Sequence, residues 1–213
     1  MTSITAAPSK PNRSAPTRKG QATRARILEA GRDVLVKRGY FSATVAEIAE
    51  ESGLALGSIY RYFDNKDDLF LELLEVLVDE LFTSVSGSWT KGEERESLRR
   101  SSRRYLATYY DNRRLIAGLL EMSAAVPECA ERWWDLRQRT FRRKTDYVRS
   151  VTHGDTLKPE LAATALATMV EQLAFHWFVE SDRHGGYVPD LDEAADVVSL
   201  IWYRAIYAEG LSA

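Results

Sequence analysis

The sequence predicts an all-α protein of about nine helices, with a three-helix helix-turn-helix unit at the amino end and a larger helical body. Apolar residues recur at helical spacing along most of the chain, and no long segment alternates apolar and polar residues as a strand would. Capping residues, prolines and glycines separate the apolar stretches. A chain of 213 residues is long enough for one large domain or two small ones.

Residues 1–22 are predicted to form a flexible basic arm. They combine prolines with many small side chains, and the first twenty include four basic residues and no acidic one. No apolar stretch follows these basic residues, so the amino end does not resemble a secretory signal and we expect a cytoplasmic protein. The single cysteine, Cys129, fits a reducing compartment, and we expect it to be a semi-buried side chain rather than a redox switch.

The first two helices follow the arm. The first is expected from Thr23, where the helical spacing of apolar residues begins, to Gly39, a residue that ends helices. Thr44 and Glu47 have the spacing of a capping box, in which the hydroxyl and the carboxylate satisfy free amides at a helix start. The second helix is therefore short and ends near Ser52.

A tight turn and two more helices come next. Gly53 can adopt the left-handed conformation that reverses the chain, so that residues 56–63 form a third short helix. Asn65 is placed to cap a long fourth helix, with Asp68 at its third position. The segment 23–67 is thus predicted to be a helix-turn-helix domain.

The remaining residues, 68–213, are predicted to form a second helical domain. Pro127 and Pro159 lie where helices can begin, and the spacing of Asp190 and Glu193 again indicates a cap. The helices expected beyond the fourth lie near residues 93–111, 113–124, 127–151, 159–181 and 190–208. No apolar run approaches the length of a membrane span, and motifs of hydrolases, nucleotide binding and zinc catalysis are absent, so we expect no enzyme, no metal, no cofactor and no membrane.

Charge is distributed unevenly along the chain. Residues 1–66 carry eleven basic and six acidic side chains, whereas residues 67–213 carry eighteen basic and twenty-five acidic ones. A basic head on an acidic body favours a polyanionic partner that binds at one end only.

Two short helices joined by a glycine turn can place the second helix in the major groove of DNA. On that helix Gly57 permits close approach of the backbone, Ser58 can contact a base or a phosphate, and Arg61 can read guanine or pair with phosphate. Ile59 and Phe63 have the spacing to face inward. The same geometry also occurs in proteins that never bind DNA, and tyrosines near a phenylalanine often belong to a core.

The segments TVAEIAEESGL (44–54), GSIYRYF (57–63) and KDDL (66–69) strongly resemble the amino-terminal signature of TetR/AcrR-family transcriptional regulators. The resemblance covers about residues 23–70. It implies an all-helical homodimer that binds double-stranded DNA, with a divergent ligand-binding body whose last two helices form the dimer. It also implies phosphate contacts from Thr44, Tyr60, Tyr62 and Lys66, and base-facing contacts from Leu56, Gly57, Ser58 and Arg61.

This chain departs from the family pattern at the start of the third helix. The family often has serine where this chain has Ala55, so a cap is missing, and the polar residue that often follows is Leu56 here. The operator sequence therefore cannot be inferred from other members of the family. Leu56 is a candidate to contact a thymine methyl group.

The body is rich in aromatic residues, which either line an apolar pocket or fill the core. Taken one at a time, these side chains are better explained as core, and His176 as a partly exposed histidine. As a set, the candidate ligand contacts are Tyr109, Met122, Trp133, Met169, Leu173, His176 and Trp177. Basic runs at 137–144 and 99–104 can either attract an anionic effector such as an acyl-CoA or form solvated helix surfaces paired with acids.

The last two helices carry the features of a dimer interface. The small residues are Ala162, Ala163, Ala165 and Ala167, and the apolar ones are Leu166, Val170, Val197, Val198, Ile201, Trp202 and Ile206. Two such pairs can build a four-helix interface. A dimer predicts a palindromic operator, and repression relieved by a small, largely apolar effector is the mode that the resemblance favours. The alternative is a helical interaction protein whose basic head binds an acidic partner without reading DNA sequence.

Overall fold

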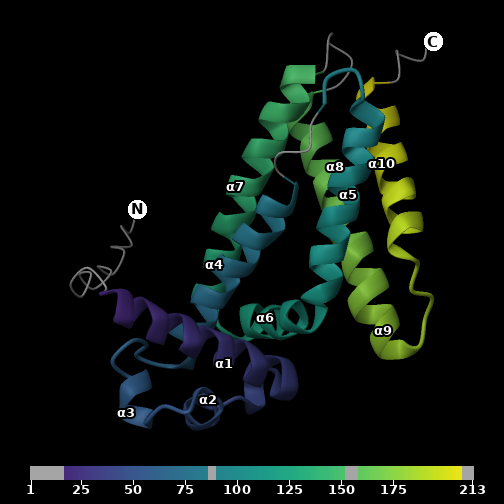
Figure 1. The fold of residues 1–213 in the computed structure, drawn as a ribbon. Helices are drawn as coiled ribbons and strands as arrows, with labels where there is room; N and C mark the ends of the chain where they lie inside the picture. Colours follow the sequence, from purple (N-terminus) through teal and green to yellow (C-terminus); the bar gives the residue numbers. More distant parts are fainter. Residues whose placement is uncertain (1–16, 86–89, 152–157, 208–213) are drawn as a thin grey trace, which may run out of the picture.

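The computed structural model describes residues 17–85, 90–151 and 158–207, and within these ranges the chain is helical and contains no strand (Figure 1). The helices are α1 (Arg18–Ser42), α2 (Val45–Ser52), α3 (Leu56–Ile59), α4 (Lys66–Val85), α5 (Glu94–Asp111), α6 (Arg113–Ala125), α7 (Pro127–Val151), α8 (Pro159–Phe175), α9 (Ser181–His184) and α10 (Leu191–Tyr207). A π-helical turn over His176–Glu180 joins α8 to α9. The predicted all-α fold is confirmed.

The amino end of α1 differs from the prediction. The helix begins at Arg18 rather than Thr23, because the Thr17 hydroxyl accepts a hydrogen bond from the amide of Gly20 at 3.1 Å and caps the first turn. Assigning residues 18–22 to a flexible arm was therefore wrong. Residues 1–16, the rest of the expected basic arm, lie outside the described part of the chain.

The turns of the small amino-terminal unit follow their capping residues. Gly39 has a positive φ of 73° but breaks α1 with a kink instead of ending it, and a further helical segment reaches Ser42. Thr44 and Glu47 form the predicted capping box at the start of α2, and Gly53 has the predicted left-handed conformation at φ 61°. The third helix is shorter than predicted, since it ends at Ile59 and continues only as turns.

The fourth helix belongs to both parts of the molecule. Asn65 caps it as predicted, because its side-chain oxygen accepts a hydrogen bond from the amide of Asp68 at 2.9 Å. The first turns of α4 bury Leu69 and Phe70 in the same core as α1, while the later turns bury Leu77 within the body. Figure 1 shows α4 rising from the small unit into the body beside α7.

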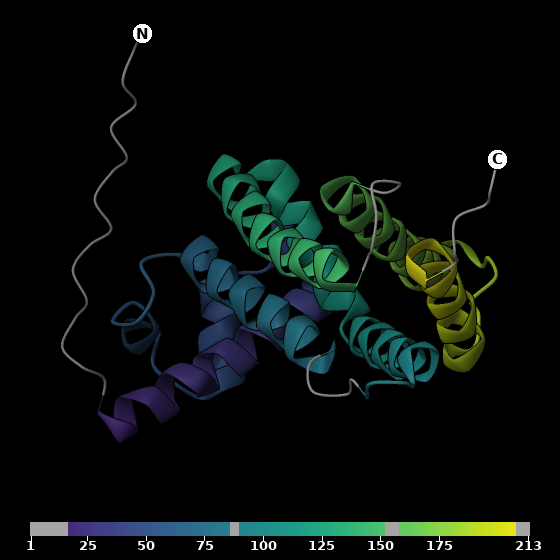
Figure 2. The same cartoon turned by 90° about the horizontal axis from the view of Figure 1, so that it is seen from above.

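The body is a bundle in which α10 packs most extensively against α5, and α8 against α7. The view from above shows these long helices clustered beside the amino-terminal unit (Figure 2). Helix α6 lies at the base of the bundle against α1 (Figure 1). Their approach is close because a Cβ atom on Gly118 would lie only 3.0 Å from Leu35 Cδ1.

The predicted helix over 159–181 is not regular throughout. It is helical to Phe175, then forms one π-helical turn, and resumes as α9 to His184. A π turn adds a residue to the helical repeat, so side chains after it point in directions that simple spacing does not predict. No helix in the described ranges combines the length and the apolar character needed to cross a membrane.

Candidate DNA-binding surface and ligand pocket

Three buried side chains fix the orientation of the helix-turn-helix. Ile48 of α2 is fully buried, and Ile59 and Phe63 are 1% and 4% exposed. The amide of Gly53 donates to the carbonyls of Ala49 and Glu50, which closes the turn between α2 and α3. The prediction that Ile59 and Phe63 face inward is confirmed, and Leu56, Tyr60 and Arg61 are left on the outside.

The outer face of α3 carries the predicted base-facing residues. Leu56 is 44% exposed, and no atom lies within 4 Å of the place where a Cβ on Gly57 would stand, so a partner can approach the backbone there. An Arg61 guanidinium nitrogen lies 3.3 Å from the Ser58 hydroxyl oxygen, which brings these two side chains together. Ala55 makes no side-chain capping bond, because its methyl group cannot accept a hydrogen bond. Figure 1 shows α3 at the end of the molecule that lies away from the body.

The two predicted tyrosines differ in exposure. Tyr60 is 47% exposed, whereas Tyr62 is half-buried, with its hydroxyl close to Gly20 at the start of α1. The backbone carbonyl of Tyr62 also accepts a hydrogen bond from Arg24 at 3.3 Å. Tyr62 therefore lies where the first turn of α1 meets the recognition segment.

Thr44 and Lys66 are both engaged within the chain. The Thr44 hydroxyl donates to the Glu47 carboxylate at 2.9 Å. The Lys66 ammonium donates to the backbone carbonyls of Tyr40 and Ala43, at 2.9 and 3.2 Å, and lies 4.5 Å from the centroid of the Tyr40 ring. Burial and a hydrogen bond to Asp67 raise the pKa of that tyrosine to about 12. Lys66 thus stabilises the end of α1, a role that the sequence analysis missed.

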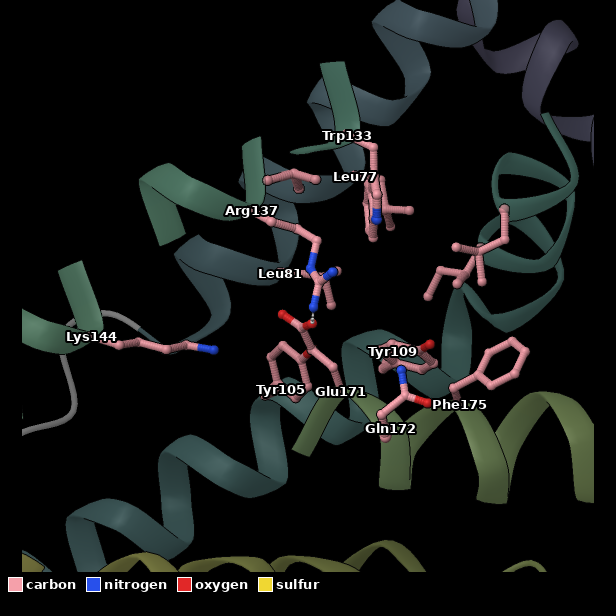
Figure 3. A pocket seen from close by; sticks show the side chains of 13 residues that line it. Leu77, Leu81, Tyr105, Tyr109, Trp133, Arg137, Lys144, Glu171, Gln172 and Phe175 are labelled. Carbon is pink, nitrogen blue, oxygen red and sulfur yellow. Dashed lines mark hydrogen bonds and ion pairs between the residues drawn. The ribbon is translucent and has the colours of Figure 1, made fainter. Parts of the chain in front are cut away.

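The body contains a cavity of about 280 Å³ enclosed by five helices (Figure 3). Most of its wall is apolar or aromatic, and three of the lining side chains are charged. The lining residues are Leu77, Val78, Leu81, Tyr105, Tyr109, Ile116, Leu120, Trp133, Arg137, Lys144, Glu171, Gln172 and Phe175.

The predicted ligand contacts coincide with this wall at Tyr109 and Trp133 only. Met122 is fully buried in the core, and Met169 and Leu173 pack against the core from faces of α8 that do not line the cavity. None of these three side chains lines the cavity, and their contact with a ligand stays a prediction.

The two predicted contacts from the π-helical turn also lie elsewhere. His176 is exposed, with its Nδ1 atom 3.1 Å from Glu180, as the alternative interpretation held. Trp177 packs edge-on against Phe178, with the ring centroids 6.3 Å apart. Neither side chain lines the cavity.

The cavity has an ionisable wall, to which the basic run predicted at 137–144 contributes Arg137 and Lys144, whereas Glu171 was not predicted. Figure 3 shows Arg137 and Glu171 pointing toward each other, with a 2.8 Å ion pair between Nη2 and Oε2. Lys144 extends toward Tyr105, and its ammonium lies 5.8 Å from the centroid of that ring. Burial raises the pKa of Tyr105 and of Tyr109, which keeps both phenols protonated. The available signal was the spacing of Trp133, Arg137 and Lys144 along one face of a helix.

The two basic runs have different surroundings. Arg99 and Arg103 of α5 pair with acids of α10, including Asp192 at 3.2 and 2.9 Å. The run at 99–104 therefore fits the alternative interpretation, in which it is a helix surface paired with acids rather than a site for an anionic effector. In the run on α7, Arg139 and Arg142 are exposed, whereas Arg137 and Lys144 line the cavity.

Most of the residues expected at a dimer interface instead pack inside this chain. Ala163 and Ala167 are fully buried, and Leu166, Val198 and Trp202 are buried as well. Ala165, Val197 and Ile201, which were also expected at the interface, are exposed on the outer faces of α8 and α10, together with Leu161.

Known proteins resemble this chain most specifically at its amino end. Residues 27–73 match the family of bacterial regulatory proteins named after TetR. The uncharacterized HTH-type transcriptional regulator YuxN of Bacillus subtilis is 27% identical over 181 residues, which cover 81% of this chain and 59% of YuxN. The chain thus spans a little less than two thirds of that relative. The regulator TtgR of Pseudomonas putida is 46% identical over 57 residues, 27% of either chain.

The fold of the whole chain has counterparts among solved structures. A TetR-like transcriptional regulator from Rhodococcus sp. RHA1 superposes with a TM-score of 0.66 at 21% identity, covering 88% of this chain and 97% of the other. This likeness shows a shared fold, and the sequence matches place the shared motif in α1 to α4. Residues 27–73 therefore match the TetR family of bacterial regulatory proteins, and the whole chain has the fold of TetR-like regulators.

Proposed function

We propose that this protein is a sequence-specific, DNA-binding transcriptional regulator that acts in the cytoplasm as a homodimer. In this proposal it is a repressor that leaves a palindromic operator when a small, largely apolar ligand enters the cavity of the body. The observation that carries the proposal is the outer face of α3, where Leu56, Gly57 and Tyr60 are exposed while Ile59 and Phe63 anchor the segment from below.

The recognition surface has side chains suited both to contacts with base edges and to contacts with the phosphate backbone. Ser58 and Arg61 are adjacent and can hydrogen-bond base edges, whereas Leu56 can contact a thymine methyl group. Tyr60 and Tyr62, with Thr44 at the start of α2, can hydrogen-bond phosphates on either side. The exposed basic residues Arg18 and Lys19 at the start of α1 add attraction to the backbone.

The exposed apolar faces of α8 and α10 support a dimer. Leu161 is 67% exposed and Val197 is 50% exposed, and each has a further exposed residue one turn along the same helix. In a dimer, two copies of both helices would form a four-helix interface that removes these side chains from water. Two recognition helices would then meet half-sites about 34–36 Å apart, or a multiple of one helical turn.

The position of the cavity supports a ligand-controlled switch. Its wall includes Leu77, Val78 and Leu81 of α4, the helix whose first residue, Lys66, stabilises the helix-turn-helix unit. A ligand that prefers one position of α4 would shift the dimer toward one spacing of its recognition helices and lower operator affinity, typically by about 1–3 kcal/mol. The cavity is largely apolar, and an acyl-CoA is one candidate ligand.

The proposal is tested by selecting binding sites for the purified full chain from random DNA duplexes. We expect an enriched palindrome, and a mobility shift on that site that weakens as salt rises. The Arg61→Ala variant serves as the specificity control. If the folded chain enriches no site, the alternative of a helical interaction protein without sequence-specific DNA binding is correct instead.

A further inference from the structure

The cavity in the body has an uneven charge balance. Arg137 and Lys144 contribute two positive charges to its wall, and Glu171 contributes one negative charge. Arg137 and Glu171 neutralise each other in a 2.8 Å ion pair, so the charge of the Lys144 ammonium is not balanced. No acidic side chain in the described ranges lies within ion-pair distance of this ammonium. Burial lowers the pKa of Lys144. An anion beside this ammonium would compensate for the water that the side chain has lost.

A second donor on the same wall lacks an acceptor. The Nε atom of Arg137 is buried, and it has no hydrogen-bond partner among the described residues. A buried N–H group without an acceptor is unfavourable, and a ligand oxygen can satisfy it. Arg137 is already held in place by Glu171, so its guanidinium is oriented before a ligand arrives.

The charged side chains of the cavity lie on one side, whereas Gln172 and Tyr109 lie near Phe175 on the other (Figure 3). Trp133, Arg137 and Lys144 follow one face of α7, and eleven residues of helix correspond to about 16 Å between the first and the last. Lys144 is next to Tyr105, whereas Trp133 is next to Leu77 in Figure 3. The wall beyond the charged end also includes Ile116, Leu120 and Phe175. An occupant that matches this wall has a charged head and an apolar tail.

The volume of the cavity limits the size of the occupant. A water molecule occupies about 30 Å³ in the liquid, so a cavity of about 280 Å³ holds roughly nine non-hydrogen atoms. That is the size of a carboxylic acid of seven or eight carbons. A coenzyme A group is several times larger, so a thioester could place only its acyl chain inside and would bring no carboxylate to Lys144.

The geometry points to a medium-chain carboxylate as the ligand of this cavity, with its carboxylate beside Lys144 and Arg137 and its alkyl chain directed toward Trp133 and Phe175. The inference rests on the proposed function, because it names the ligand class of the same switch. It specifies the small, largely apolar ligand as an amphipathic anion that carries a carboxylate.

The test is isothermal titration calorimetry of the full chain with octanoate, octanamide and octanoyl-CoA. Octanamide has the same chain length and shape as octanoate but no charge. We expect octanoate to bind at least tenfold more tightly than octanamide, and octanoyl-CoA to bind more weakly than octanoate. Equal affinity for octanoate and octanamide would overturn the inference, as would no octanoate binding or tighter binding of the thioester.

The matched variants are Lys144→Met and Arg142→Met, which remove one positive charge each from α7. Lys144 lines the cavity, whereas Arg142 is exposed. We expect K144M to weaken octanoate binding at least tenfold and to leave octanamide binding unchanged, while R142M alters neither. Unchanged octanoate affinity in folded K144M contradicts the inference. Lys144→Gln replaces K144M if circular dichroism shows that the methionine variant does not fold.

Operator binding, measured without any ligand, separates this inference from the proposed function. If the chain selects a palindrome but does not discriminate octanoate from octanamide, the inferred carboxylate ligand is wrong. The proposed function as a DNA-binding regulator is then still supported. If octanoate binds through Lys144 but no DNA site is selected, the inferred carboxylate site is supported. The proposed function as a sequence-specific DNA-binding regulator is then wrong.

Discussion

Arg32 of α1 donates a hydrogen bond to the side-chain oxygen of Asn112, the residue between α5 and α6. A second guanidinium nitrogen of Arg32 lies 3.6 Å from Glu80 of α4. Asn112 is only 5% exposed, and its amide group donates to the Thr108 carbonyl at 2.8 Å. This one arginine therefore connects the amino-terminal unit to two parts of the helical body.

We expect Arg32→Ala to lower the free energy of unfolding by about 1–2 kcal/mol, because the oxygen of Asn112 loses its charged donor in a mostly buried site. The measurement is urea denaturation followed by circular dichroism. Arg26→Ala, an exposed arginine on the same helix, should change the free energy of unfolding by no more than about 0.5 kcal/mol. A loss in R26A as large as that in R32A would show that the Asn112 contact is not the cause.

Lys66→Met is expected to weaken both folding and DNA binding. Two backbone carbonyls, those of Tyr40 and Ala43, lose their ammonium donor, which should cost about 1–2 kcal/mol of unfolding free energy. If Lys66 also contacts phosphate, affinity for specific and non-specific duplexes should fall together, and the salt dependence should decrease by about one phosphate contact. Urea denaturation and DNA titrations at several salt concentrations measure the two effects. Stability equal to that of the natural chain would contradict the role seen at the end of α1.

Tyr60→Phe is expected to affect DNA binding alone. The Tyr60 side chain is about half exposed, so removal of its hydroxyl should leave the unfolding transition within about 0.5 kcal/mol. Loss of a phosphate contact should weaken binding to specific and non-specific duplexes by a similar factor. A variant that changes the preferred sequence instead would show that Tyr60 reads a base.

Arg61→Ala is expected to relax the preference at one position of each half-site. An arginine that reads guanine contributes about 1–3 kcal/mol of discrimination against the wrong base. Site selection from random duplexes, carried out in parallel with the unchanged chain, measures this directly. If affinity falls equally on every sequence, Arg61 contacts phosphate.

Cys129 is expected to resist alkylation in the folded protein. The side chain is fully buried, and burial raises the pKa of its thiol to about 11, so about one molecule in a thousand carries the thiolate at pH 8. Iodoacetamide should modify the unfolded chain in urea at pH 8 much faster than the folded chain, as measured by mass spectrometry. Because the pKa is raised on folding, this contribution to stability is complete below about pH 9 and is lost as the pH rises to about 11. Equal rates in both states would contradict the burial.

The amino-terminal unit was largely predictable because its structure depends on local residues. The capping box at Thr44, the left-handed turn at Gly53 and the inward direction of Ile59 follow from neighbouring side chains. The start of α1 was missed because Thr17 lies among residues whose composition indicates disorder, and one threonine was enough to cap the helix there.

The ligand cavity was less predictable because it depends on how several helices are rotated relative to one another. Apolar residues occur around most of α8, so their spacing does not distinguish Met169 and Leu173, which face elsewhere, from Phe175, which lines the cavity. The basic run at 137–144 was noted, but its partner Glu171 was not, and the pairing of Arg137 with Glu171 makes a charged wall compatible with burial.

Helix α4 contains neither proline nor glycine between Lys66 and Val85, and it is about 30 Å long. A helix without such residues has no point at which it bends easily. Its upper turns border the cavity and its first residue secures the end of α1, so a displacement at one end is not absorbed along the way. Helix α4 is thus a rigid connection between the cavity and the helix-turn-helix unit. A small molecule bound at one end and a DNA duplex bound at the other would each change the affinity for the other.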